Sequence, residues 1–173
     1  ASILIASIVA LTKDDLKARL AYSTVSQLSY ITLGMALANQ MGVIGGSMHI
    51  VTHAVGKITL FMCAGAIYVA AHKTKVSELD GLGRKMPVTF ICFTIAALSI
   101  IGLPPFAGAW SKWYLLLAAA DEGQMALIAV LMLSSLLNVA YLLSISGRAF
   151  FAPARDRMAH SLDAAAAPSK GIE

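Results

Sequence analysis

Charged residues are scarce in this chain, and their scarcity excludes an ordinary soluble domain. Asp, Glu, Lys and Arg make up only 13% of the 173 residues, against about a quarter in soluble globular domains. Hydrophobic residues account for 58% of the chain. A soluble core of this size cannot hide so many apolar side chains, because a surface in water needs polar cover. The excess apolar surface is therefore expected to face the lipid bilayer.

Cysteine is also scarce, and the motifs of enzymes and nucleic-acid binders are missing. Cys63 and Cys92 both lie inside apolar runs, which predicts two small buried hydrophobic residues rather than a disulfide or a metal site. The net charge of +4 is not gathered in a basic stripe with interleaved aromatics, which argues against nucleic acid. The sequence has no phosphate-binding loop, nucleophile constellation or redox motif, so we expect no cofactor.

The apolar residues fall into five segments typical of membrane helices. A bilayer needs about 20 residues per crossing, so the opening segment is too short, and we expect a partial helix with further residues upstream. The segments span residues 1–12, 20–38, 42–71, 88–120 and 124–151. The sequence thus predicts an all-α, polytopic transmembrane helix bundle over 1–151. The tail at 152–173, rich in Ala, Pro and charge, is predicted to be disordered and cytoplasmic.

The basic residues alternate along the chain in a way that predicts its topology. All but two of the 13 Lys and Arg residues lie in the first connection, the third connection or the end of the chain: Lys13, Lys17, Arg19, Lys73, Lys75, Arg84, Lys85, Arg148, Arg155, Arg157 and Lys170. The second connection has none, and the fourth is acidic only. By the positive-inside rule, the basic connections and the tail are expected in the cytoplasm of a bacterial inner membrane. This topology requires 88–120 to cross once.

The segment 88–120 is too long for one straight helix. It would stretch roughly 50 Å, well beyond a hydrocarbon core of about 30 Å. Its middle reads Gly102-Leu103-Pro104-Pro105, and because proline has no N–H, the carbonyls of Ile100 and Ile101 lose their helical partners. We therefore predict two half-helices joined by an unwound linker at 102–105. Transporters use such breaks to hold ions, whereas a proline kink would serve packing alone.

Lys112 follows this break and is a candidate proton carrier. An ionisable side chain within a membrane span is costly and marks a functional candidate. The alternative is that Lys112 extends to the interface beside Trp110 and Trp113, since tryptophan favours that zone. Position alone does not separate the two interpretations, but the neighbouring break favours function.

The segment 42–71 carries His49, His53 and Lys57 at a spacing of four residues. On a helix all three share one face, and each step rises about 6 Å. Titratable groups in file across a membrane indicate a proton relay. A metal site is the other interpretation, but it needs a third good ligand, and a protonated lysine is a poor one. We therefore predict a relay and no metal.

Two further segments each carry a polar face at helical spacing. These faces consist of Tyr22, Ser23, Ser26, Gln27 and Tyr30 in one segment and Ser134, Asn138 and Tyr141 in the other. Such stripes most often hold helices together. A role in ordering water along a path is the alternative.

Three stretches together resemble one known family. They are DLKARLAYSTVSQLSY at 15–30, HIVTHAVGK at 49–57 and GLPPFAGAWSKW at 102–113. They are similar to signatures of antiporter-like subunits in NADH:quinone oxidoreductase, related hydrogenases and Mrp cation/proton antiporters. The stretch ELDGLGRKMP at 78–87 and the Ser-Lys-Trp ending look most like the D-type member of the Mrp antiporters.

The resemblance implies roles and partners. Lys112 corresponds to the lysine of the family's broken helix, and His49, His53 and Lys57 correspond to its relay helix. The chain would then be part of the second of two inverted repeats, working with other antiporter or complex I-like membrane subunits on protons and monovalent cations (Na+ or K+).

Three functions are compatible with these features. The first is a proton-translocating subunit of a multi-subunit cation/proton antiporter. The second is a proton-pumping subunit of complex I or a related hydrogenase. The third is an assembly or interaction module with no transport of its own. A secondary transporter subunit, rather than an enzyme, is the preferred prediction.

Overall fold

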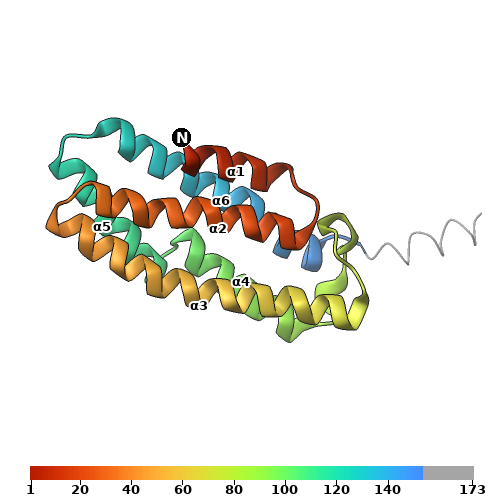
Figure 1. Cartoon of the computed structure of the whole chain (residues 1–173). Helices are drawn as coiled ribbons and strands as arrows, with labels where there is room; N and C mark the ends of the chain where they lie inside the picture. The colour runs from red at the N-terminus through yellow and green to blue at the C-terminus, as the bar shows by residue number, and fades with distance from the viewer. Residues whose placement is uncertain (154–173) are drawn as a thin grey trace, which may run out of the picture.

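The computed structural model describes residues 1–153, which form a bundle of helices lying roughly along one axis (Figure 1). Its α-helices are α1 (Ser2–Thr12), α2 (Leu16–Ala36), α3 (Gln40–Ala71), α4 (Pro87–Ile101), α5 (Ala107–Asp121) and α6 (Met125–Phe151). Across residues 1–153 there are also two short 3-10 helices, η1 (Val76–Glu78) and η2 (Leu82–Arg84), and no β-strand. The predicted all-α fold is therefore confirmed. Apart from its first two residues, the predicted tail 152–173 lies outside the described residues.

Side-chain caps set where α2 and α3 begin. The Asp15 carboxylate accepts a hydrogen bond from the Ala18 N–H, and the Asn39 side chain accepts one from the Gly42 N–H, which satisfies N–H groups that a helix start leaves free. Because of the first cap, α2 begins four residues before the predicted position 20. Arg19 accordingly lies inside the helix, where it is buried and its Nε donates to the Lys13 carbonyl at 2.8 Å.

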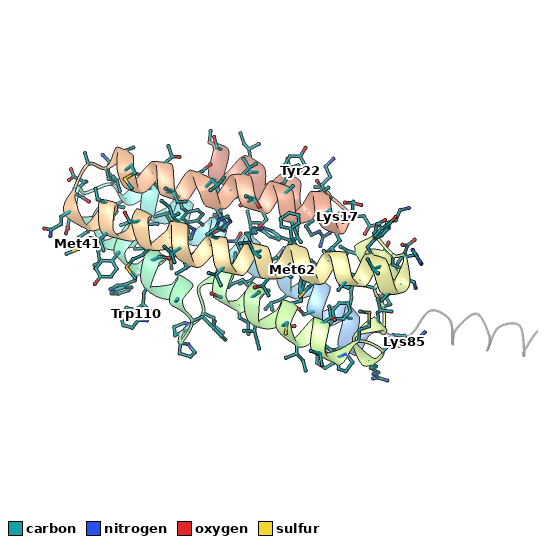
Figure 2. All side chains as sticks on the ribbon, turned by 60° about the horizontal axis from the view of Figure 1, so that its bottom comes forward. Lys17, Tyr22, Met41, Met62, Lys85 and Trp110 are labelled. Carbon is teal, nitrogen blue, oxygen red and sulfur yellow. The ribbon has the colours of Figure 1, made fainter. Side chains whose placement is uncertain are left out.

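The two ends of the bundle differ in charge. The α1–α2 and α3–α4 connections meet at one end, where the Leu16 N–H donates to the Thr74 carbonyl at 2.8 Å. The end of α6 lies there too, because the Gly81 N–H donates to the Arg148 carbonyl at 3.3 Å. Figure 2 shows Lys17 and Lys85 toward this end and Met41 at the opposite one. The basic connections therefore share one end of the molecule.

The predicted break is present, and α4 and α5 together cross the bundle once. α4 starts at the basic end and stops at Ile101, where Gly102 adopts a positive φ of 87°. α5 then begins at Ala107 and runs to the opposite end (Figure 1). The two helices approach closely beside the break, since a Cβ on Gly108 would lie only 1.8 Å from the Ser99 carbonyl oxygen. The ends of α4 and α5 thus pack directly on each other, while the linker residues 103–105 between them are exposed.

Apolar side chains cover the outside of the bundle as well as its interior. Among the described residues, α3 and α6 are each long and apolar enough to cross a membrane. Val51, Val55 and Met62 on α3 are mostly exposed, and Figure 2 shows Met62 on the outer side of that helix. Cys63 is buried as predicted, but the prediction for Cys92 is wrong, because that residue lies on the exposed side of α4. An apolar segment need not be buried in protein when its outer face suits lipid.

Candidate functional site

Lys112 lies inside the bundle, next to the break between α4 and α5. Its Nζ donates to the Ile101 carbonyl at 2.8 Å and to Ser135 Oγ at 3.4 Å. The neighbouring Trp110 and Trp113 are 60% and 56% exposed, whereas Lys112 is only 8% exposed. Figure 2 shows Trp110 directed away from the helices. Lys112 therefore does not follow the tryptophans outward, as the alternative interpretation required.

A cavity of about 740 Å³ adjoins this lysine. Pro104, Pro105 and the two tryptophans contribute to its walls, which are apolar apart from the indole N–H groups and the side chains of Lys112 and Ser135. The break therefore leaves room beside the lysine. An apolar cavity with few polar groups strengthens the electrostatic interactions of those groups, because little solvent screens them.

Lys57 is buried near the middle of α3. Its Nζ donates to the Leu20 carbonyl at 2.9 Å and to Ser23 Oγ at 2.8 Å. Ser23 Oγ also shares a hydrogen bond of 3.0 Å with the Tyr141 hydroxyl, which in turn hydrogen bonds with Asn138 Oδ1. The lysine is thereby connected through α2 to the polar face of α6, a connection that the sequence did not indicate.

His49 connects the row of His49, His53 and Lys57 on α3 to helix α5. Its Nδ1 lies 3.0 Å from Ser111 Oγ, and its Nε2 lies 3.1 Å from Gln27 Oε1. Its ring stacks on the ring of His53, with 6.0 Å between the ring centroids. Ser111 directly precedes Lys112 on α5, and the Tyr30 ring contacts both His49 and Lys112, so His49 lies close to that lysine. The three residues predicted to share a face of α3 do so, and all three are buried.

Unpaired polar atoms lie along the stretch between the two lysines. Gln27 Nε2, His53 Nε2 and Asn138 Nδ2 are buried and lack a hydrogen-bond partner among the described residues. They belong to α2, α3 and α6, respectively. A buried polar atom without a partner is costly, so these atoms mark positions where further hydrogen bonds would be favourable.

Neither lysine is neutralised by an acidic side chain within residues 1–153. Both ammonium groups donate to carbonyl and hydroxyl oxygens instead, and the ion pair between Arg148 and Asp80 lies at the basic end. In the same part of the chain, no group of three or more His, Cys, Asp or Glu side chains is arranged to hold a metal ion. In this site, therefore, both lysine side chains contact uncharged oxygens and, among the described residues, no carboxylate.

Several residues of this site are not evident from the sequence pattern. Ser111 contacts His49 and Ser135 contacts Lys112, although neither serine carries a signal of its own in the sequence. Tyr30 belongs to a predicted polar face, but its contact with Lys112 is not evident from that pattern. Conversely, Tyr22 is predicted on the same polar face but is half-exposed and lies beneath Lys13. Helical spacing alone does not exclude Tyr22, because it lies four residues before Ser26, at the edge of the same face.

One protein family matches most of this chain. The family described as "NADH:quinone oxidoreductase/Mrp antiporter, TM" matches residues 1–138. Subunit N of the NADH-quinone oxidoreductase of Desulforudis audaxviator is 42% identical over 150 residues, which are 87% of this chain and 30% of that relative.

Two solved structures show the same arrangement of helices. A chain of the Mrp complex of a Dietzia species superimposes with a TM-score of 0.84 at 34% identity, covering 88% of this chain and 28% of that one. A chain of respiratory complex I from Thermus thermophilus, solved with bound NADH, gives 0.82 at 27% identity, covering 88% and 32%. This chain thus spans less than a third of the length of these relatives.

These matches identify the family as well as the fold. The family model covers most of the chain, including the break, the histidine row and both lysines. The resemblance inferred from the sequence is thereby confirmed. The chain belongs to the NADH:quinone oxidoreductase/Mrp antiporter transmembrane family and corresponds to part of a membrane antiporter-like subunit.

Proposed function

We propose that this chain conducts protons as part of a subunit of a multi-subunit monovalent cation (Na+ or K+)/H+ antiporter. One observation carries the proposal. Lys57 and Lys112 are buried in one bundle, each held by uncharged oxygens, and side chains with exchangeable protons lie between them. A structural lysine in a membrane interior would be expected to pair with an acid, because an uncompensated charge there is costly.

The proposed proton path runs from Lys57 to Lys112 along the polar interior. Ser23 and Tyr141 adjoin Lys57, and His49 with Ser111 adjoins Lys112. Water bound at Gln27, His53 and Asn138 would complete the path, since a buried water typically makes about three hydrogen bonds to such groups. A charge on one lysine disfavours a charge on the next, because like charges repel strongly where the dielectric is low.

Location and partners follow from the same proposal. The basic end of the bundle would face the cytoplasm of a bacterial inner membrane, as the positive-inside rule expects. The exposed apolar faces would meet lipid and the other membrane subunits, since the similar chains in the Mrp and complex I structures come from multi-subunit assemblies. The chain would form part of the second inverted repeat of its subunit.

Cation/proton exchange in everted membrane vesicles tests the proposal, using the full subunit within its complete set of partner subunits. Sodium- or potassium-driven proton movement should be lost in Lys57→Ala and in Lys112→Ala. Lys17→Ala is the control, because Lys17 is exposed at the basic end. Normal exchange by both interior variants, with protein levels matched, would contradict the proposal and favour an assembly module without transport.

A redox-driven proton pump is the second candidate, favoured by the 42% identity to a subunit of NADH-quinone oxidoreductase. The same vesicles distinguish it. Proton movement on addition of NADH or a hydrogenase donor, with no response to sodium or potassium, would assign the chain to the redox-driven branch. If Lys112→Ala abolishes that movement, Lys112 lies on the proton path of a redox-driven pump, and only the energy source differs from the first proposal.

A further inference from the structure

Tyr30 is the one aromatic side chain that contacts both Lys112 and His49 among the described residues. The Lys112 Nζ lies over the Tyr30 ring, 5.4 Å from its centroid. The His49 ring stacks on the same tyrosine, with 5.5 Å between centroids and an angle of 28° between planes. Tyr30 is 1% exposed. The ring therefore contacts both the lysine of the broken helix and the first histidine of the row.

The ring offers the ammonium a favourable surface without a formal charge. The face of an aromatic ring is electron-rich and attracts a cation, and the attraction is stronger where water is excluded. The other neighbours of the Lys112 ammonium are the Ile101 carbonyl and the Ser135 hydroxyl, which are also uncharged. The Tyr30 ring is thus one of three uncharged groups that stabilise the protonated lysine.

The groups around Lys112 come from every helix that packs against α5, and among the described residues none of them is acidic. The titratable groups are Tyr30 on α2 and the row of His49, His53 and Lys57 on α3. α4 contributes a carbonyl, and α6 contributes Ser135, with Tyr141 more than a helical turn farther along. Within residues 1–153 no acidic side chain pairs with the lysine, and a positive charge on the histidine row would repel it. The ring, together with the Ile101 carbonyl and the Ser135 hydroxyl, is therefore placed to offset that repulsion.

We infer that Tyr30 is a positioning residue whose aromatic face holds the protonated Lys112 beside His49 and sets the pH range over which proton transfer between them works. The inference rests on the proposed function, since it concerns the same path. The hydroxyl has a different part: it donates to the Leu131 carbonyl at 3.4 Å and secures the ring against α6. The ring and the hydroxyl can therefore be tested separately.

The experiment measures cation- or redox-driven proton movement against pH in vesicles that contain the full complex. Tyr30→Phe keeps the ring and should keep the wild-type pH profile. Tyr30→Leu removes the ring, so the alkaline limb of the profile should move by about one pH unit toward lower pH, as expected for the loss of a desolvated cation–π contact. Tyr22→Leu is the control, because Tyr22 lies on the same helix but is half-exposed.

A second series guards against misfolding of the leucine variant. Phenylalanine and its mono-, di- and trifluoro derivatives at position 30 keep the shape of the ring while weakening its electron-rich face. The alkaline limb should move stepwise toward lower pH with each fluorine. An unchanged profile across this series would overturn the inference, as would a rate lowered by the same factor at every pH.

Lys112→Ala separates failure of this inference from failure of the proposed function. If that variant loses proton movement while the fluorinated series leaves the pH profile unchanged, only the role of Tyr30 is overturned. If Lys112→Ala moves protons normally, the proposed path fails and the inference fails with it.

Discussion

The Lys112 ammonium takes the place of a backbone N–H that Pro105 lacks. In a continuous helix, the Ile101 carbonyl would accept a hydrogen bond from the amide four residues later, at position 105. Proline has no such amide, and the Lys112 Nζ donates to this carbonyl instead, at 2.8 Å. The broken helix and the buried lysine are thus one structural feature. Loss of a proton from Lys112 would therefore weaken its hydrogen bond to the backbone carbonyl at the break.

Gly102→Ala should displace Lys112. Gly102 has a positive φ of 87°, and an added Cβ would lie 2.9 Å from the Lys112 Cδ. We expect a loss of about 1–2 kcal/mol from the backbone conformation, together with a several-fold loss of transport because the lysine must move. Gly123→Ala is a matched control, since it has a positive φ of 64° with no neighbour within 4 Å. Equal transport by the two variants at equal protein level would contradict this prediction.

Gly108→Ala should disrupt the packing of α5 against the end of α4. An added Cβ would lie 1.8 Å from the Ser99 carbonyl oxygen, so the backbone of one helix must move. Gly65→Ala has the opposite expectation, because its Cβ would meet nothing within 4 Å and alanine favours a helix over glycine by about 1 kcal/mol. Thermal unfolding of the full subunit in detergent should show a lower midpoint for the first variant and an unchanged or higher one for the second.

Tyr141→Phe should weaken the link between Lys57 and α6. The variant removes the hydroxyl that bonds with Ser23 Oγ and Asn138 Oδ1. Ser23 Oγ keeps its bond from Lys57, but the buried Asn138 Oδ1 is left unsatisfied at a cost of about 1–3 kcal/mol. Proton movement should slow several-fold, whereas Tyr68→Phe, at an exposed position on α3, should not change it. Wild-type rates in Tyr141→Phe would remove this hydroxyl from the proposed path.

Asp14, in the connection before α2, should make stability depend on pH. The Ser77 hydroxyl and N–H donate to its carboxylate at 2.7 and 3.1 Å, and these bonds, led by the hydroxyl, hold the pKa of Asp14 below its usual value of 3.8 despite partial desolvation. Because this pKa is lower in the folded than in the unfolded state, the stabilisation is full above the unfolded value and is lost as pH falls through the folded one.

The Asp14→Asn variant tests this pH dependence. The full subunit should lose part of its thermal stability between about pH 5 and 3, and the variant should lose less over that range. The effect should stay below about 1 kcal/mol, because the carboxylate is exposed to solvent. Identical pH dependence in the two proteins would show that the contact with Ser77 does not stabilise the connection.

Much of the fold could be predicted because its signals are local. Apolar runs indicate membrane helices, a Pro-Pro pair interrupts one of them, and spacing of four residues places His49, His53 and Lys57 on one face. The predicted start of α2 is too late, because charged residues near a helix end resemble a connection. The prediction for Cys92 fails because hydropathy cannot separate a lipid-facing side from a protein-facing one.

The order of amino acids alone specifies the all-α class, the break and the identity of the ionisable residues within the membrane. Which residues meet them depends on the packing of the helices: Tyr30 and Ile101 at Lys112, Ser111 at His49, and Tyr141 through Ser23 at Lys57. The reason is physical. Helical periodicity follows from hydrogen bonds between residues four apart, whereas contacts between helices depend on how whole faces pack, over separations of up to 118 residues in this site.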